Sequence, residues 1–185
     1  MIKINLYGAP SSGKSTLAGQ LFGELKSRGL SVAFVQEYAK EQVYQGVDMT
    51  TLEEAERIII LGEQFRREKI LENKVKYLVT DSPLLLTAYY HKDPKGKFDF
   101  GYAKDIAMRH LKSNELHIWL QVEGKFEEEE RSHNKEQSLI IQKELKEYLI
   151  SCGIHLIEVK GKPQERLKKV LSYIEDKESN YETIM

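Results

Sequence analysis

One segment near the N-terminus has the residue types and spacing of a phosphate-binding loop. The run Gly8-Ala-Pro-Ser-Ser-Gly13-Lys14-Ser15 satisfies the pattern G-x-x-x-x-G-K-[ST] without a mismatch, and it lies between an apolar strand-like segment and a helical one. The glycines let successive backbone N–H groups point inward, and the following helix adds the positive end of its dipole. We therefore predict that ATP phosphates bind to Gly8, Ala9, Pro10, Ser11, Ser12, Gly13, Lys14, Ser15 and Thr16.

Two side chains of this loop and one distant carboxylate are candidates for phosphoryl chemistry. Lys14 is expected to reach the β- and γ-phosphates, and Ser15 to offer its hydroxyl to Mg²⁺. Asp81 directly follows the apolar run Tyr77–Thr80, where an aspartate can hold Mg²⁺ through the water shell of the ion. The alternative is that Asp81 only caps the helix that follows it.

A second carboxylate, Glu37, follows the apolar run Leu30–Val35. Beyond the end of such a strand it would face the acceptor substrate and accept a hydroxyl proton, or orient that hydroxyl. The alternative is an exposed turn glutamate paired with Lys40.

The charged stretch 124–137 is a candidate lid over the nucleotide. Its basic residues would neutralise charge on the transferring phosphoryl group, and Arg131 is the residue predicted for that role. The neighbouring run Glu127–Glu130 instead favours a solvated surface segment.

Apolar patterning places these residues on alternating strands and helices. Such alternation predicts an α/β fold with three layers, in which a mainly parallel five-stranded sheet carries helices on both faces and binds ligands beyond the carboxyl ends of its strands. The predicted strands are Ile2–Tyr7, Leu30–Val35, Tyr77–Thr80, Leu116–Val122 and Ile154–Val159, and the predicted helices are Lys14–Arg28, Thr51 or Leu52 to Asn73, Leu84–Tyr90, Tyr102–Leu111, Ser138–Ser151 and Pro163 to about Ile174.

Composition limits the size and the partners of the protein. The 185 residues and 41% hydrophobic content suit one domain, predicted at 1–176, with a polar tail at 177–185. A formal net charge of -1 gives no field for nucleic acid or anionic membrane, so no stable nucleic-acid or membrane partner is expected. The single cysteine, the absence of a long apolar stretch and the lack of a signal-peptide pattern lead us to expect a cytoplasmic protein. The histidines have no metal-ligand spacing, so Mg²⁺ is the metal expected.

Four segments together resemble the P-loop AAA-like kinase family, which is typified by the ribosylnicotinamide kinase domain of the bacterial NAD-biosynthesis regulator and includes phage-type stand-alone members. These segments are Gly8–Thr16, Glu37-Tyr-Ala-Lys-Glu41, Thr80-Asp-Ser82 and Arg131-Ser-His133. The resemblance implies ATP-dependent phosphorylation of a ribosyl hydroxyl, with Glu37 facing the substrate and Asp81 facing Mg²⁺.

Three hypotheses for function follow from these observations. The first is a kinase that transfers the γ-phosphoryl group of ATP to a nucleoside-like acceptor such as nicotinamide riboside. The second is a deoxynucleoside monophosphate kinase, whose acceptor phosphate would need extra arginines, for which Arg57, Arg66, Arg67 and Arg109 are available. The third is an NTP-binding regulatory module without an acceptor.

Overall fold

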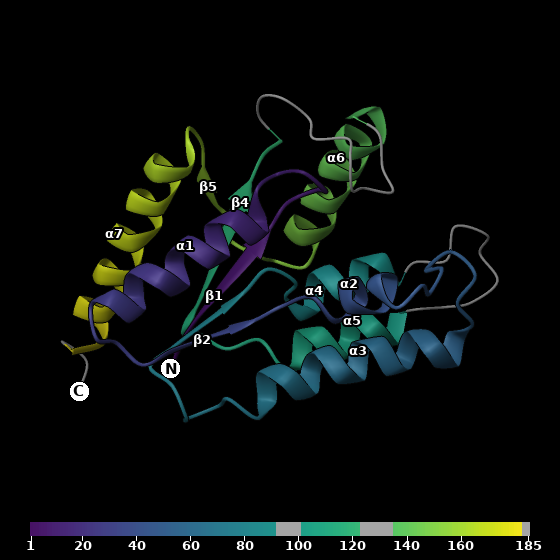
Figure 1. Cartoon of the computed structure of the whole chain (residues 1–185), viewed down its shortest axis with the longest axis horizontal. Helices are drawn as coiled ribbons and strands as arrows, with labels where there is room; N and C mark the ends of the chain where they lie inside the picture. The colour runs from purple at the N-terminus through teal and green to yellow at the C-terminus, as the bar shows by residue number, and fades with distance from the viewer. Residues whose placement is uncertain (92–100, 123–134, 183–185) are drawn as a thin grey trace.

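The computed structural model describes residues 1–91, 101–122 and 135–182 and has five strands and seven helices in these ranges (Figure 1). Along the chain they are β1 (Ile2–Tyr7), α1 (Lys14–Ser27), β2 (Val32–Val35), α2 (Tyr38–Tyr44), α3 (Glu54–Lys69), β3 (Tyr77–Thr80), α4 (Leu84–Tyr90), α5 (Gly101–Arg109), β4 (Glu115–Leu120), α6 (Lys135–Ser151), β5 (Ile157–Val159) and α7 (Pro163–Glu182).

The strands form one parallel sheet in the order β2-β3-β1-β4-β5. β1 therefore pairs with β3 on one side and with β4 on the other, although these strands are far apart in the sequence. Because all strands run in the same direction, the carboxyl ends of β1, β2 and β3 lie together at one end of the sheet. The residues that follow these strands are therefore neighbours.

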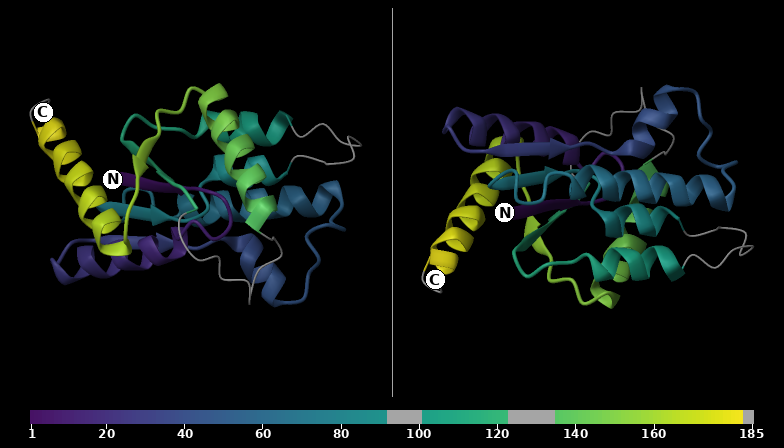
Figure 2. Two further views of the ribbon diagram at one scale, coloured as in Figure 1. Left: turned by 90° about the horizontal axis from the view of Figure 1, so that it is seen from above. Right: turned by 90° about the horizontal axis from the view of Figure 1, so that it is seen from below.

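The two faces of the sheet are covered by different helices (Figures 1 and 2). Ile2, Ile4 and Leu6 of β1 pack against α1 and α7 in one apolar cluster. Tyr7 and Trp119 point to the other face, where α4, α5 and α6 form a second cluster. This alternation along β1 follows from the period of two residues in a strand. The predicted three-layer α/β fold with a parallel five-stranded sheet is confirmed.

Most element boundaries differ from the sequence predictions by a few residues, and three differences have a clear structural reason. The residues after Glu37 form a helix, α2, which the pattern of the sequence did not reveal because none of its residues is buried. α3 begins at Glu54 because the carboxylates of Glu53 and Glu56 form a capping box, so neither Thr50 nor Thr51 is the cap. The last helix continues to Glu182, beyond its predicted end at about Ile174, so residues 177–182 of the predicted polar tail are helical.

Within the described ranges, none of the helices combines the length and the apolar character needed to cross a bilayer.

Candidate functional site

The segment between β1 and α1 adopts a compact loop that depends on its glycines. Gly8 has φ +154°, and a Cβ atom at this position would lie 2.4 Å from the carbonyl oxygen of Leu120 and 2.5 Å from Oγ of Ser12. Ser11 and Gly13 also have positive φ values, +67° and +89°. The loop thus turns through left-handed conformations at Ser11 and Gly13, and the Ser12 N–H donates to the carbonyl oxygen of Ala9 at 3.2 Å within the turn.

Lys14 lies across the mouth of this loop. Its ammonium group donates to the carbonyl oxygens of Gly8 at 2.8 Å and Ala9 at 3.1 Å. The side chain therefore folds back over the loop. These are carbonyl contacts that an incoming phosphate can replace, since Lys carries three donors on a flexible stem.

Ser15 and Asp81 meet because β1 and β3 are adjacent strands. Ser15 Oγ donates a hydrogen bond of 2.8 Å to Asp81 Oδ2, and the second carboxylate oxygen, Oδ1, is buried without a partner in the described ranges. Pro83, not Asp81, is the N-cap residue of α4, and the cap makes no side-chain hydrogen bond. The alternative capping role of Asp81 is therefore not observed.

The Ser15–Asp81 pair fits a magnesium ion. A hydroxyl and a carboxylate with an unused oxygen are the hard ligands that Mg²⁺ takes from a protein when phosphate oxygens and water supply the rest. No cluster of three or more His, Cys, Asp or Glu side chains suited to a metal occurs in the part of the chain that the structure describes. A metal bound only by protein ligands is therefore not indicated there.

Glu37 is partly buried at the end of β2 and is not an exposed turn residue. Burial raises the pKa of its carboxyl group, the nearby Asp81 carboxylate raises it further, and the ammonium groups of Lys14 and Lys40 oppose the shift. Because Val35 of β2 pairs with Thr80 of β3, Glu37 and Asp81 follow neighbouring strands at the same end of the sheet. Lys40, its partner in the alternative interpretation, instead lies 5.5 Å over the ring of Tyr44.

Two residues that the sequence analysis did not identify interact with Glu37 or with the residue that follows it. Gln64 of α3 is only 1% exposed, and its Oε1 accepts a hydrogen bond of 2.9 Å from the backbone N–H of Tyr38, the first residue of α2. Burial first, and then the charge of Glu37, raise the pKa of the hydroxyl of Tyr90 at the end of α4. Gln64 thus fixes the chain just after Glu37, and Tyr90 forms part of its surroundings.

Two of the candidate phosphate-binding arginines pair with carboxylates. Arg67 makes two hydrogen bonds to Glu41, at 2.5 and 2.6 Å, and one of 3.0 Å to Glu63. Arg66 also binds Glu63, at 2.7 and 2.8 Å. Hydrogen bonds from Arg66 and Arg67 lower the pKa of Glu63 to about 2, so the neutralising charge is present at any physiological pH. The guanidinium of Arg67 also lies 4.6 Å from the centre of the Tyr38 ring and covers one of its faces.

The other two arginines are placed differently. Arg57 donates to the backbone carbonyl oxygens of Leu52 at 3.2 Å and Met49 at 3.3 Å, which ties α3 to the segment before it. Arg109 is exposed in the last turn of α5. Arg57, Arg66 and Arg67 thus serve intramolecular contacts in this structure.

The candidate lid cannot be placed with the rest of the site. Residues 123–134, and with them Arg131, lie outside the described residues. The described end of the predicted segment, 135–137, forms the first turn of α6. The role of Arg131 therefore stays a prediction from the sequence.

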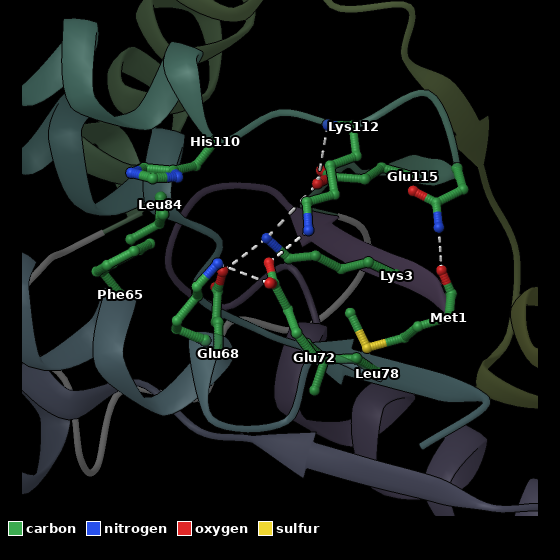
Figure 3. Close-up of a pocket in the computed structure, with 12 residues that line it drawn as sticks. Met1, Lys3, Phe65, Glu68, Glu72, Leu78, Leu84, His110, Lys112 and Glu115 are labelled. Atoms are coloured by element: carbon green, nitrogen blue, oxygen red, sulfur yellow. Dashed lines mark hydrogen bonds and ion pairs between the residues drawn. The ribbon is translucent and has the colours of Figure 1, made fainter. Parts of the chain in front are cut away.

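A small polar cavity lies at the opposite, amino-terminal end of the strands (Figure 3). Lys3 of β1 binds Glu68 of α3 at 2.6 Å, with Glu115 of β4 at 4.0 Å. Burial raises the pKa of Glu68, and Lys3 opposes the shift. The cavity measures about 20 Å³, which suffices for about one water molecule. The ion pairs balance the buried charges, and the cavity is too small for a nucleotide.

The comparisons with known proteins agree with this geometry. A family described as "AAA domain" matches residues 3–166. The chain belongs to this AAA domain family. No curated protein matches the sequence.

Two solved structures share the fold. One is a thymidylate kinase from Candida albicans, with a TM-score of 0.59, 14% sequence identity, and coverage of 96% of this chain and 92% of the other. The second is NadR protein in complex with NR, with a TM-score of 0.63, 18% identity, and coverage of 87% of this chain. The match spans 46% of the NadR chain, which is less than half of its length. At these identities the likeness establishes the fold alone.

Proposed function

We propose that the protein is an ATP-dependent kinase that transfers the γ-phosphoryl group to a hydroxyl of a nucleoside-like acceptor. In this proposal Gly8–Thr16 hold the triphosphate, with Lys14 on the β- and γ-phosphates. Ser15 and Asp81 hold Mg²⁺, which neutralises charge on the phosphate oxygens. Glu37 orients the acceptor hydroxyl or accepts its proton, and Arg131 contacts the transferring group.

The observation that carries the proposal is the position of Glu37 relative to the phosphate loop. A protein that only binds NTP needs the loop and the magnesium ligands, whereas a second carboxylate at this end of the sheet can serve as the base for an attacking hydroxyl. Glu37 is partly buried there and interacts with the charges of Lys14 and Asp81. A carboxylate at this place suits proton transfer from an attacking hydroxyl, because its raised pKa lies closer to neutral pH than that of a free glutamate.

The arginine contacts favour an acceptor without a phosphate group. Recognition of a monophosphate depends on guanidinium groups that can turn towards it. Arg66 and Arg67 share Glu63, Arg67 also binds Glu41, and Arg57 binds backbone oxygens. Redirecting Arg57, Arg66 or Arg67 would cost contacts already made, which favours the neutral nucleoside; the exposed Arg109 is the candidate that a monophosphate acceptor would use.

An acceptor screen tests the proposal. Purified protein with ATP and Mg²⁺ is incubated with nicotinamide riboside, deoxynucleosides and the corresponding monophosphates, and ADP release is followed. We expect at least one nucleoside to raise turnover well above the rate with ATP alone, and the matching monophosphate to be a poorer acceptor. A response confined to monophosphates would favour a nucleotide kinase instead.

Two variants separate a kinase from an NTP-binding module. Lys14→Ala is expected to abolish transfer, while Glu37→Gln lowers transfer by about 10²- to 10⁴-fold and leaves ATP affinity nearly unchanged. If no acceptor raises turnover and Glu37→Gln leaves the slow ATPase rate as it was, the kinase proposal fails and the regulatory module remains.

A further inference from the structure

Arg166, in the first turn of α7, connects three loops at the nucleotide edge of the sheet. Its side chain is buried, with 8% of the residue exposed. Nη1 donates to the carbonyl oxygen of Ser12 at 2.7 Å, Nε to that of Gly161 at 2.8 Å, and Nη2 to that of Gln121 at 3.4 Å. These carbonyls belong to the phosphate loop after β1, the loop after β5 and the segment after β4.

The contact with Ser12 fixes the direction of one amide of the phosphate loop. In a planar trans peptide the C=O and the following N–H point in opposite directions. Because Arg166 holds the Ser12 oxygen from the outer side of the loop, the Gly13 N–H must point away from Arg166. A Cβ atom on Gly13 would lie 3.3 Å from Nη1, so the guanidinium packs directly behind this peptide.

Docking of α7 does not by itself require this residue. The helix packs on the sheet and on α1 through Leu167, Val170, Leu171 and Ile174, which belong to the apolar cluster on that face. Arg166 is thus a permanently charged group placed behind an anion-binding loop, with its donors used on loop carbonyls. A guanidinium can reach three carbonyls at once because its donors are arranged in a rigid fork, whereas an ammonium is a single point of attachment.

We infer that Arg166 is a positioning residue for nucleotide binding, which aims the Gly13 amide at the phosphates and joins the phosphate loop to the segments after β4 and β5. The inference rests on the phosphate-binding part of the proposed function and is independent of the acceptor. It goes beyond the sequence motif, which ends at Ser15.

The test compares Arg166→Lys with a control variant that affects the same pair of helices. Arg28→Ala removes the exposed ion pair of 2.9 Å between Arg28 of the α1 C-terminus and Glu175 of α7 without touching a loop. ATP dissociation constants are measured by calorimetry, and folding is checked by circular dichroism and urea unfolding. We expect Arg166→Lys to weaken ATP binding about tenfold or more, because hydrogen bonds from a charged group are lost. Arg28→Ala should leave the ATP dissociation constant unchanged.

A rescue experiment separates positioning from a merely structural role. Arg166→Ala, at a temperature where it remains folded, should regain ATP affinity when guanidinium is added at low millimolar concentration and should not respond to ammonium. If Arg166→Lys lowers only the urea midpoint while the folded protein binds ATP as the wild type does, Arg166 is structural and the inference is overturned. The same holds if Arg166→Ala does not fold and Arg166→Lys binds ATP normally.

The outcomes also distinguish this inference from the proposed function. A wild-type protein that binds ATP but phosphorylates no acceptor would refute the kinase proposal and leave the Arg166 test intact. A wild-type protein that does not bind ATP would overturn both.

Discussion

Replacement of Gly8 by alanine tests whether the close contact with β4 holds the phosphate loop in its conformation. The added Cβ atom would lie 2.4 Å from the carbonyl oxygen of Leu120, whereas carbon and carbonyl oxygen atoms normally approach no closer than about 3.3 Å. That oxygen belongs to β4, a strand paired on both sides, so it cannot move away easily. The loop must therefore shift by roughly 1 Å, the difference between these distances.

The expected cost is large for a single methyl group. Overpacking of this kind typically costs about 1–3 kcal/mol, and a backbone conformation reserved for glycine adds about 1–3 kcal/mol. We expect Gly8→Ala to lower the free energy of unfolding by about 2–6 kcal/mol, the sum of these two costs. If the loop relaxes to avoid the strain, its amides leave their positions and ATP affinity falls at least tenfold instead.

The matched controls are Gly19→Ala and Gly23→Ala in α1. Both glycines are exposed and an added Cβ atom would meet nothing within 4 Å, so alanine should stabilise the helix by about 0.5–1 kcal/mol. Urea unfolding and calorimetric ATP titration of the three variants give the comparison. If Gly8→Ala matches the wild type in both stability and ATP affinity, the close approach to Leu120 does not constrain the loop and our reasoning is refuted.

Three further predictions concern titration and metal. Because burial raises the pKa of Glu37, and the ionised form is the active one, kcat/KM should fall with decreasing pH from above the usual glutamate range; Glu37→Gln should lack this acid limb. Burial, with the charges of Lys3 and Lys177, lowers the pKa of His117 from 6.5 to about 4. The neutral imidazole therefore contributes its full stability above pH 6.5, and the free energy of unfolding falls on acidification, by about 2 kcal/mol at pH 5. Urea unfolding of His117→Asn at the two pH values should show a smaller loss. Asp81→Asn should raise the Mg²⁺ concentration needed for half-maximal turnover about tenfold or more and leave metal-free ATP binding nearly intact, which a magnesium titration measures.

Some of the site could be found from the sequence because its information is local. The phosphate loop is a contiguous motif, so its glycines, Lys14 and Ser15 were identifiable without a fold. Arg166 also left a local signal that was not used. It precedes Val170 by one helical turn and Ile174 by two, so it falls on the buried stripe of α7, and a charged residue on such a stripe needs a partner.

The sequence by itself determined the alternation of strands and helices, the turn geometry of the phosphate loop and the candidates at the strand ends, because hydrophobic periodicity and glycine act over a few residues. Only the tertiary structure decided that β1 lies between β3 and β4, which brings Ser15 to Asp81 and Leu120 to Gly8. It also decided that Arg67 is neutralised by Glu41 of α2, 26 residues away in the sequence, whereas the pairs of Glu63 with Arg66 and Arg67 are local to α3, at spacings of three and four residues. Strand order and long-range ion pairs depend on packing between distant segments, and no local pattern encodes which of several opposite charges a side chain will meet.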